Sequence, residues 1–291
     1  SPAPGKSPDT PRAPDRALKE SGVKVELNAE VRRAEKRGEK FAAVLADGRE
    51  FISDALVVAT GGKSYPSTGS TGDGYVFAEK FGHSVVKPVP SLVQLITKED
   101  VSPLNGLSLK NVTLSAEVPG GKTVSEFGEM LFTKRGISGP VALTLSAHLN
   151  RVGGARLHLD LKPALTREKL DARILRDCSE RKNADLKNVT RALLPERLNL
   201  YVLERAGLPP GKKVNAVTKE ERTRLADTVK DLTFGFASVG PFEEAVVTSG
   251  GVSLKELTPR CESRLVKGLY FIGEVIDADA YTGGYNLQIA F

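Results

Sequence analysis

Two short apolar segments, far apart in the chain, constrain the fold most strongly. Residues 55–60 read Ala-Leu-Val-Val-Ala-Thr and run into Gly61-Gly62, and residues 268–274 read Gly-Leu-Tyr-Phe-Ile-Gly-Glu. A continuous apolar run of this kind is typical of a strand that is buried on both faces of a parallel sheet. Ligands of open α/β sheets bind at the carboxyl ends of such strands, where glycine lets the main chain approach the ligand closely. We therefore expect an α/β domain with a ligand site at these strand ends, and a purely structural turn is the alternative.

The pattern between the two runs changes after Pro88. Segments of alternating hydrophobicity follow, which indicates antiparallel strands over residues 111–118, 129–133 and 155–161. Ser138-Gly-Pro140 has the features of a helix start, because serine can cap a helix and proline suits its first turn. The order of segments predicts a nucleotide-binding domain that is interrupted by a β-rich insertion.

From Pro163 to Asp231 the periodicity is helical. Thr218-Lys-Glu-Glu221 predicts a capping box, and a further helix is expected after Pro195. Residues 163–231 contain 16 Lys and Arg against 11 Asp and Glu, so they carry +5 of the net charge of +6. A basic excess of this size can attract anionic partners, including RNA. Solvated helices often carry mixed charges as well, and in that case the charges serve solubility alone.

The segment before the first apolar run has shorter signals. A helix over Ala17–Gly22 is expected to end at its glycine, and a strand is expected over Val23–Leu27 because its apolar residues alternate. Three more strands are expected over 31–35, 41–45 and 50–52, and Asp47-Gly48 is expected to form the hairpin turn between the last two.

Other features of the chain narrow the class of protein. No stretch approaches the roughly 18 apolar residues that a membrane helix needs, and the first eight residues lack the apolar core of a secretory signal. Cys178 and Cys261 lie far apart and outside any Cys or His cluster. We therefore expect a cytoplasmic protein with neither a disulfide framework nor a bound metal. The scattered histidines, His83, His148 and His158, are expected to be structural or exposed.

Two further segments add to the expected ligand site. Gly69-Ser-Thr-Gly-Asp-Gly74 precedes a helix expected over 75–81 and resembles a phosphate-cradling loop, although no Gly-Lys-Ser/Thr closes it as in a Walker A motif. At the second strand end, Glu274 can accept hydrogen bonds from ribityl hydroxyls. A helix that begins at Thr282-Gly-Gly284 would offer N–H groups to the N1 and O2 edge of a reduced flavin. The alternative at Gly69–Gly74 is a loop that only caps its helix, and the alternative at the second strand end is a purely structural Gly-Glu turn.

Several blocks together resemble one known family. They are similar to the signature of the YhiN/BaiN-like NAD(P)/FAD-dependent oxidoreductases, and they are residues 59–74, 128–133, 136–140, 247–252 and 268–290. The blocks run in family order and the resemblance extends over nearly the whole chain from Gly22 onward. The family also begins with a strand and a Gly-x-Gly-x-x-Gly turn that binds the pyrophosphate, followed by an acidic residue for the ribose. Neither occurs here, so the resemblance implies an N-terminally truncated member, and we expect weak or no FAD binding by this chain alone.

The resemblance implies a fold of three parts. The first is an incomplete α/β FAD/NAD(P)-binding (Rossmann-like) domain at residues 17–90 and 246–291. A β-barrel-like insertion at 91–162 and 232–245 interrupts it and itself carries a helical subdomain at 163–231. This arrangement agrees with the order of segments described above.

The resemblance also implies which residues contact FAD. They are Val31, which would lie near the adenine through its backbone, Thr60, Gly61, Gly62, Gly273, Glu274, Gly284, Asn286 and Leu287. Tyr65, Tyr281 and Tyr285 could donate a proton near a flavin, with Tyr65 and Tyr285 kept as weak catalytic candidates. Aromatic packing is the alternative for each of them.

The activity that follows from the resemblance is FAD-dependent reduction. Hydride would pass from NAD(P)H through FAD to an unsaturated acceptor, which is either the activated C=C bond of a small molecule, such as an unsaturated steroid ketone, or a uridine in ribosomal RNA. The basic helical segment favours RNA. The rival reading is a non-catalytic RNA-binding module, or an inactive fragment without the pyrophosphate loop. A yellow colour on purification would separate the two readings.

Overall fold

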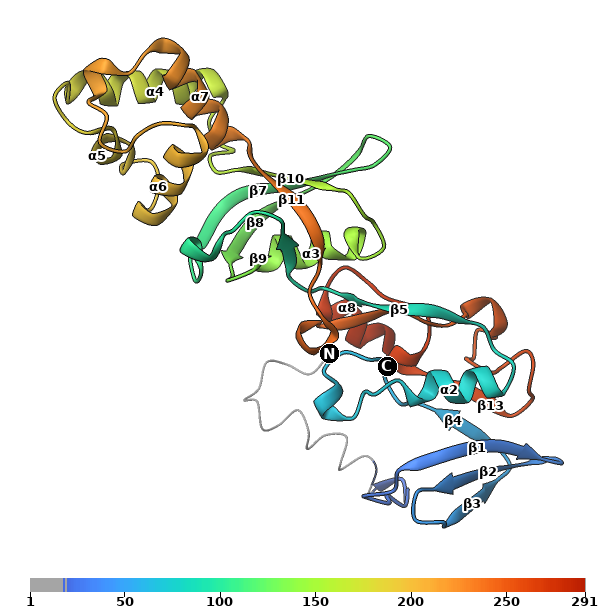
Figure 1. Cartoon of the computed structure of the whole chain (residues 1–291). Coiled ribbons are helices and arrows are strands. Elements are labelled where there is room, and N and C mark those ends of the chain that lie inside the picture. Colours follow the sequence, from blue (N-terminus) through green and yellow to red (C-terminus); the bar gives the residue numbers. More distant parts are fainter. Residues whose placement is uncertain (1–17, 19, 291) are drawn as a thin grey trace. The chain divides into compact units, whose positions relative to one another are not determined.

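The structure is a computed structural model that describes Leu18 and residues 20–290 (Figure 1). The described residues fall into two compact units, which divide between Leu56 and Val57. Part of the expected helix over 17–22 lies outside the described residues. Leu18 and Glu20 are helical, and Gly22 follows with a φ of 71°.

The first unit contains a three-stranded antiparallel sheet in the order β1-β2-β3. Its strands are β1 (Val31–Arg37), β2 (Lys40–Leu45) and β3 (Glu50–Ser53). The expected turn at Asp47-Gly48 is confirmed, since Gly48 has a φ of 89° and its N–H donates to Leu45 at 3.1 Å. The strand expected over Val23–Leu27 is wrong, because no described strand pairs with this segment and its apolar side chains stay exposed.

The second unit contains a closed barrel of six strands in the order β10-β11-β6-β9-β8-β7. The strands are β6 (Leu95–Thr97), β7 (Ser108–Val118), β8 (Lys122–Phe132), β9 (Gly136–Ser138), β10 (Arg156–Asp160) and β11 (Leu232–Val239). Alternate side chains of these strands fill the interior, among them Leu114, Leu157 and Phe234. Helix α3 (Pro140–Leu149) adds Leu145 to the same core. The expected barrel is confirmed, while its place as an insertion in a nucleotide-binding domain stays a prediction.

A bulge sets the register of the longest hairpin of the barrel. The pairing of β7 with β8 shifts between Leu109 and Val112, and Asn111 adopts a left-handed φ of 55°. Asparagine tolerates this conformation better than most residues. Because of the extra residue, Leu109 and Val112 both face the core although they are three positions apart. Strict alternation would place them on opposite faces of the strand.

The start of α3 corrects the expected serine cap. Ser138 ends β9, while Gly139 is the N-cap with a φ of 86° and no side chain caps the helix. A Cβ on Gly139 would lie 2.9 Å from the Cα of Met130. The sharp turn from β9 into α3 therefore needs glycine at the N-cap position, which Ser138 was expected to occupy.

The helical segment has four α-helices, which are α4 (Arg167–Glu180), α5 (Leu186–Thr190), α6 (Glu196–Arg205) and α7 (Lys219–Lys230). The capping box at Thr218 and Glu221 is confirmed. The apolar faces of these helices pack with the barrel side chains in one core cluster, which includes Leu170, Val202 and Val229. Within the described residues, no helix is both long and apolar enough to cross a membrane.

The remaining segments form two small sheets and two helices. β4 (Leu56–Val58) neighbours β13 (Leu269–Phe271), and β5 (Val85–Ser91) pairs with β12 (Val247–Val252). Helix α2 (Asp73–Lys80) follows β4, and α8 (Gly283–Ala290) ends the described chain. The strand β4 is not buried on both faces as expected, since Val57 is 53% exposed and Val58 only 4%. The described residues pack over the face of β4 that carries Val58 and leave the face of Val57 uncovered. The Rossmann-like domain and all domain boundaries stay predictions.

A substitution at Gly136 tests whether β9 and β6 approach each other closely enough to close the barrel. A Cβ at this position would clash with the carbonyl oxygen of Leu95 on the neighbouring strand. Overpacking a tight contact costs about 1–3 kcal/mol, and backbone cannot move aside as a side chain can. We expect Gly136→Ala to lower the thermal midpoint measured by circular dichroism.

Gly153→Ala is the matched control, because a Cβ there meets nothing within 4 Å. It should leave the midpoint within the change of an ordinary surface substitution, about 0.5 kcal/mol. Equal midpoints for the two variants would contradict the close approach of β9 and β6.

Candidate functional site

A buried threonine joins the two expected strand ends. Thr248 of β12 is 2% exposed, and its Oγ1 accepts hydrogen bonds from the N–H groups of Lys63 at 2.8 Å and Ser64 at 3.1 Å. Its own N–H donates to Oε1 of Glu274 at 2.7 Å. We call Gly62, Lys63, Ser64, Thr248 and Glu274 the Thr248 junction. It fixes the loop after β4, the strand β12 and the loop after β13 to one another.

Glycine is required where these segments meet. A Cβ on Gly62 would clash with Oγ1 of Thr248 and lie 3.1 Å from the carboxyl carbon of Glu274. A Cβ on Gly74, in the first turn of α2, would clash with Oγ1 of Thr60 and lie 2.8 Å from Val275. The two glycines therefore let the loop over 60–62 pack between α2 and the loop after β13.

A cavity of about 300 Å³ lies beside the junction. Its lining residues are Val246, Val247, Gly273, Glu274, Ala278, Gly283, Asn286, Leu287, Ile289 and Ala290. Four of the residues predicted to contact FAD are among them, which are Gly273, Glu274, Asn286 and Leu287. Apolar side chains with one carboxylate and one amide are the kind of lining that suits a flat, mostly apolar ligand with a few polar groups.

The other predicted site residues lie outside this lining. Gly62 contacts Glu274 through the junction, and Thr60 and Gly61 directly precede Gly62. Gly284 follows the cavity residue Gly283 in the first turn of α8. Val31 belongs to the first unit, where it begins β1 opposite Leu45.

Asn286 organises the loop that leads into α8. Its Oδ1 accepts the N–H of Ala280 at 2.9 Å, and its Nδ2 donates to the carbonyls of Ala280 at 2.6 Å and Thr282 at 2.8 Å. The side-chain amide is therefore engaged by the protein itself. Any contact of Asn286 with a ligand would have to use its backbone or its edge.

The carboxylate of Glu274 is the charged group of the cavity. Burial raises the pKa of Glu274, while the N–H groups of Thr248 and Gly62 lower it and the charge of Asp279 raises it further. Burial also raises the pKa of Tyr75, whose hydroxyl is buried without a hydrogen-bond partner among the described residues. Tyr75 feels the charges of Glu274 and of Asp277, so these groups share one poorly solvated region.

The tyrosines considered as proton donors are exposed. Tyr65 is 49% exposed in a left-handed turn with a φ of 50°, and Tyr285 is 64% exposed on α8. Neither lines the cavity. Tyr281 stacks on His148 with ring centroids 4.6 Å apart, which favours the packing alternative for that residue.

The loop over 69–74 lies beside the predicted flavin loop. Ser70 Oγ would be 3.2 Å from a Cβ on Gly61, and Gly72 is the N-cap of α2 with a φ of 90°. The side chain of Lys63 lies against Gly72, 3.0 Å from the position of its Cβ. Phosphate binding by this loop stays a prediction.

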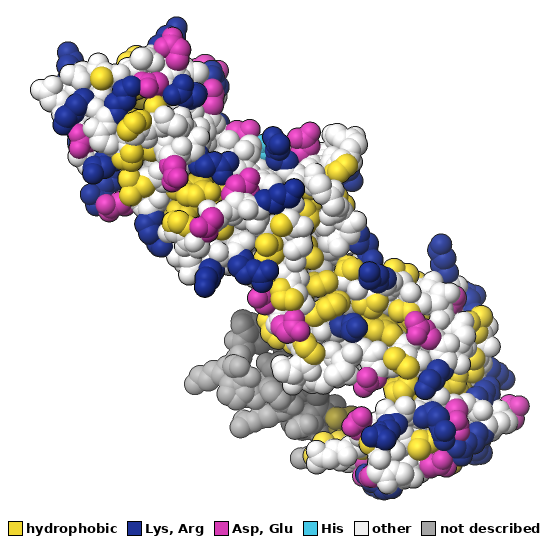
Figure 2. Space-filling model, in the orientation of Figure 1, with side chains coloured by type: hydrophobic (Ala, Val, Ile, Leu, Met, Phe, Trp, Pro, Cys, Tyr) yellow, Lys and Arg dark blue, Asp and Glu magenta, His cyan; other side chains and the backbone are white. Residues whose placement is uncertain are grey.

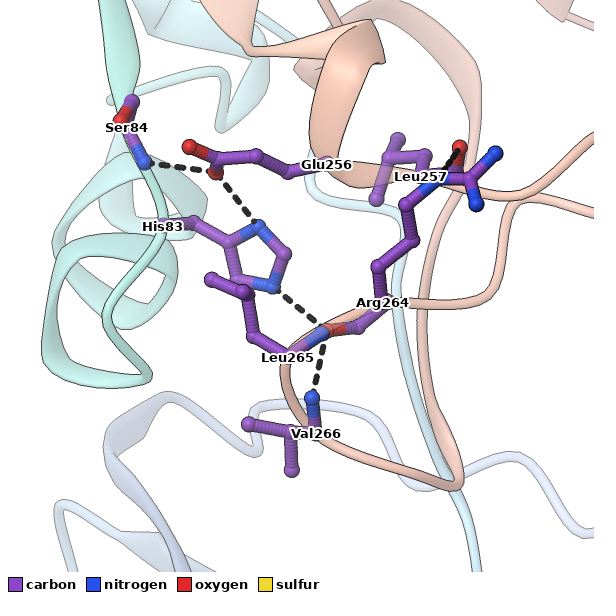
Figure 3. A network of polar contacts seen from close by, with 8 residues as sticks. His83, Ser84, Glu256, Leu257, Arg264, Leu265 and Val266 are labelled. Atoms are coloured by element: carbon purple, nitrogen blue, oxygen red, sulfur yellow. Dashed lines mark hydrogen bonds and ion pairs between the residues drawn. The ribbon is translucent and has the colours of Figure 1, made fainter.

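A serine, a histidine and a glutamate form a buried chain (Figure 3). His83 Nδ1 lies 3.0 Å from Glu256, and Nε2 lies 2.7 Å from Ser263 Oγ. Ser263 Oγ already accepts the N–H groups of Leu265 at 3.0 Å and Val266 at 2.8 Å. With both lone pairs used, the hydroxyl donates to Nε2, and Nδ1–H donates to Glu256. The oxygen is saturated and Ser263 is 5% exposed, so this chain holds loops together rather than attacking a substrate.

Sequence reasoning missed two residues of the site. Thr248 lies in the block 247–252 that carried part of the family resemblance, yet nothing in its spacing indicated that it would bind the first glycine loop. Tyr75 directly follows Gly74 and was expected only as a helix residue. Cys178 and Cys261 are free, and no group of three or more His, Cys, Asp or Glu in the described part of the chain could hold a metal ion.

Comparison with known proteins adds a family and several relatives. Residues 89–247 match the family model described as "HI0933-like protein barrel and H2TH domain". This range contains the closed barrel and the four helices of the helical segment.

Three relatives are similar over most of this chain. A "Ribosomal RNA dihydrouridine synthase" of Haemophilus influenzae is 34% identical over 93% of this chain and 66% of its own length. One of the same name from Escherichia coli is 33% identical over 84% of this chain and 60% of its length. A "3-dehydro-bile acid delta(4,6)-reductase" of Clostridium scindens is 28% identical over 93% of this chain and 66% of its own length. The chain thus spans slightly less than two thirds of the length of these relatives, whose names are those of oxidoreductases.

The raised pKa of Glu274 predicts how stability depends on pH. A carboxyl group whose pKa is higher in the folded chain destabilises the fold as pH rises from its ordinary value of 4.5 through the folded pKa. Glu274→Gln keeps an oxygen that can accept both N–H groups but removes the buried charge. We expect the free energy of unfolding of this variant, relative to that of the wild type, to be larger at about pH 7 than at about pH 4. Urea unfolding at both pH values measures this difference. A stability difference that is the same at both values would show that the charge is not buried unfavourably.

Proposed function

The chain belongs to the HI0933-like family, and on this premise we propose that it is a major part of a flavin-dependent reductase. The observation that carries the proposal is the Thr248 junction, which positions Glu274 at a cavity beside two glycine loops. The oxidoreductase names of the relatives support the same class of reaction.

The residues at the cavity fit the flavin end of FAD. Gly62 and Gly74 let the loop over 60–62, Thr248 and the loop after β13 pack closely, which places Glu274 at the cavity. Glu274 offers an acceptor for a ribityl hydroxyl, and the first turn of α8 offers free N–H groups of Gly283 and Gly284. The sequence has no Gly-x-Gly-x-x-Gly turn for the pyrophosphate, so these residues account for one end of the cofactor only.

The protein residues have distinct roles in this proposal. Bound FAD would supply the two-electron chemistry that carries hydride from NAD(P)H to the acceptor. Glu274 would accept a hydrogen bond from the ribityl chain, and Thr248 would hold Glu274 and the loop of Gly62 in register. Tyr65 and Tyr285 stay the candidates for proton donation to the acceptor, since both hydroxyls are accessible to an incoming molecule.

We infer that the acceptor is a uridine in RNA. Two of the three relatives are named for ribosomal RNA, and they are more similar to this chain than the relative named for a bile acid. The helical segment carries most of the surplus positive charge, which suits a polyanion better than a small steroid. An activated C=C bond of a small molecule remains the second candidate because of the bile acid reductase.

The rival class is a non-catalytic RNA-binding protein. In this reading the basic helices still bind RNA, but the Thr248 junction has a purely structural role. The two readings differ in whether FAD affinity depends on the carboxylate at the cavity.

In the intact protein, of the full length of the relatives, Glu274→Ala should weaken FAD binding. Loss of a hydrogen bond to a charged group costs about 1.5–3 kcal/mol, which corresponds to roughly a 10- to 100-fold rise in the dissociation constant. The constant is measured by quenching of flavin fluorescence as the protein is titrated into FAD. Glu274→Gln, which keeps the backbone contacts, should show a smaller rise.

Glu262→Ala is the matched control. Its Oε1 also accepts a backbone N–H, that of Gly268 at 2.9 Å, but Glu262 does not line the cavity. It should bind FAD as the wild type does. Equal FAD affinities for Glu274→Ala and Glu262→Ala would remove Glu274 from the proposed site and favour the non-catalytic reading.

A further inference from the structure

The basic residues of the helical segment fall into two groups. In the first group, Arg222 binds Asp171 at 2.8 Å, Arg167 binds Asp227, and Lys230 binds Asp160 at 2.6 Å. These pairs join α4 to α7, and α7 to β10. Their charges are neutralised within the protein, so they add nothing to the surplus.

The second group lies where two loops run side by side. Leu186 N–H donates to Lys212 at 2.8 Å, Lys187 N–H to Pro210 at 3.1 Å, and Asn215 N–H to Lys182 at 3.2 Å. These bonds bring residues 181–188 next to residues 210–215. The exposed polar side chains of the two loops form what we call the basic platform, and they are Arg181, Lys182, Asn183, Lys187, Asn188, Lys213 and Asn215.

Three cations of the platform form no ion pair with an acidic residue that the structure describes, although the charge of Lys187 helps to lower the pKa of Asp185. Among the described residues, Arg181, Lys182 and Lys187 form no ion pair, whereas Lys213 binds Asp185 at 2.8 Å. Lys212 of the same loop is bound by both carboxylate oxygens of Glu221, each at 2.7 Å. Glu180 is the acidic neighbour in sequence, so a net positive charge remains at the platform. Figure 2 shows Lys and Arg side chains along the outer edge of the helical segment, at the upper left of the view.

Two arginines of α4 do not belong to this group. Arg173 and Arg176 both face Asp177, at 3.7 Å and 3.3 Å. Arg173 also donates to the carbonyl of Ala192 at 3.5 Å. The platform therefore gathers unpaired cations on two adjacent loops, while Lys169 and Lys219 are exposed cations elsewhere in the helical segment that form no ion pair among the described residues.

The platform also lacks what an apolar partner needs. None of the exposed large hydrophobic side chains of the described chain lies in residues 181–188 or 210–215. A membrane surface would require an apolar face beside the cations, and a stable protein interface would require an apolar centre. Arginine, lysine and asparagine together are the donors that proteins use on phosphate and sugar oxygens.

We propose that the basic platform binds the sugar–phosphate backbone of the RNA acceptor. Guanidinium and ammonium groups would contact phosphates, and the asparagine amides would contact phosphate or 2′-hydroxyl oxygens. The choice of RNA rests on the proposed function, but binding at the platform requires no flavin. The platform would hold the RNA by its backbone while the cavity beside Glu274 acts on a base.

The test is the triple reversal Arg181→Glu, Lys182→Glu and Lys187→Glu in the full chain. The probe is a fluorescein-labelled stem–loop RNA, and binding is followed by fluorescence anisotropy at several salt concentrations. Each phosphate contact contributes about 0.7–0.9 to the slope of log affinity against log salt, so we expect the slope to fall by about 2–3. Affinity at about 150 mM salt should fall at least roughly tenfold, because low-dielectric contacts to phosphate are lost and repulsion replaces them.

The control is Lys80→Glu, Lys122→Glu and Lys255→Glu. These three exposed lysines lie on α2, on β8 and beside β12, so the net charge changes equally while the platform stays intact. Its salt slope should stay close to that of the wild type. Equal losses in both variants, or no loss in the platform variant, would overturn the proposal.

Two further measurements keep the result decisive. If circular dichroism shows that the reversal variant is unfolded, Lys182→Gln with Lys187→Gln replaces it, and the slope should fall by about 1.4–1.8. FAD titration of the same preparations separates the two proposals. For this comparison the variants are made in a protein of the relatives' full length, since weak or no FAD binding is expected of this chain alone. If that protein binds RNA through the platform but takes up no FAD, only the proposed function is contradicted, and the opposite result contradicts only the platform.

Discussion

The hydrogen bonds of Thr248 are the interaction on which the candidate site depends. One buried hydroxyl accepts two N–H groups from the loop after β4, and the N–H of the same residue donates to Glu274. A buried hydroxyl that lost these partners would cost about 1–3 kcal/mol, so the three segments are held together or lost together. The glycine loops and the carboxylate, which are far apart in sequence, share a site because of this residue.

Close packing around glycine explains why the site needs so little side-chain chemistry. Gly62 and Gly74 each leave no room for a Cβ, and the neighbours they meet are Thr248, Glu274, Thr60 and Val275. The cavity beside this packing is lined by glycines, one carboxylate, one amide and apolar side chains. Such a lining suits a cofactor that brings its own reactive atoms, because the protein then has only to position it and tune its surroundings. The Ser263–His83–Glu256 chain contains residue types that are often catalytic, yet it stabilises the fold. Both lone pairs of the Ser263 hydroxyl accept backbone N–H groups, so the hydroxyl is not available to a substrate.

The sequence predicted the elements that depend on local signals. Alternation predicted β7, part of β8 and β10, but not the other barrel strands β6, β9 and β11. The capping box of α7 follows from its own four residues, and the turn at Gly48 follows from the Asp-Gly pair. Predictions failed where the answer depends on a distant partner. Val23–Leu27 alternates, but no described strand pairs with it. Val57 is exposed because no described segment covers its face of β4, and Gly139 takes the N-cap position because Met130 lies too close for a Cβ there. For the site, the resemblance indicated Glu274 and the glycines, but only the folded chain brings Thr248 to them.

The central claim is that FAD binds where the Thr248 junction meets the cavity, and hydrogen–deuterium exchange tests it most directly. Backbone amides of residues 60–64, 247–249 and 273–287 should exchange more slowly when saturating FAD is added, because a bound ligand suppresses local opening. Amides of the helical segment over 167–230 should not change. Protection confined to other segments, or no protection at FAD concentrations that saturate binding, would contradict the account.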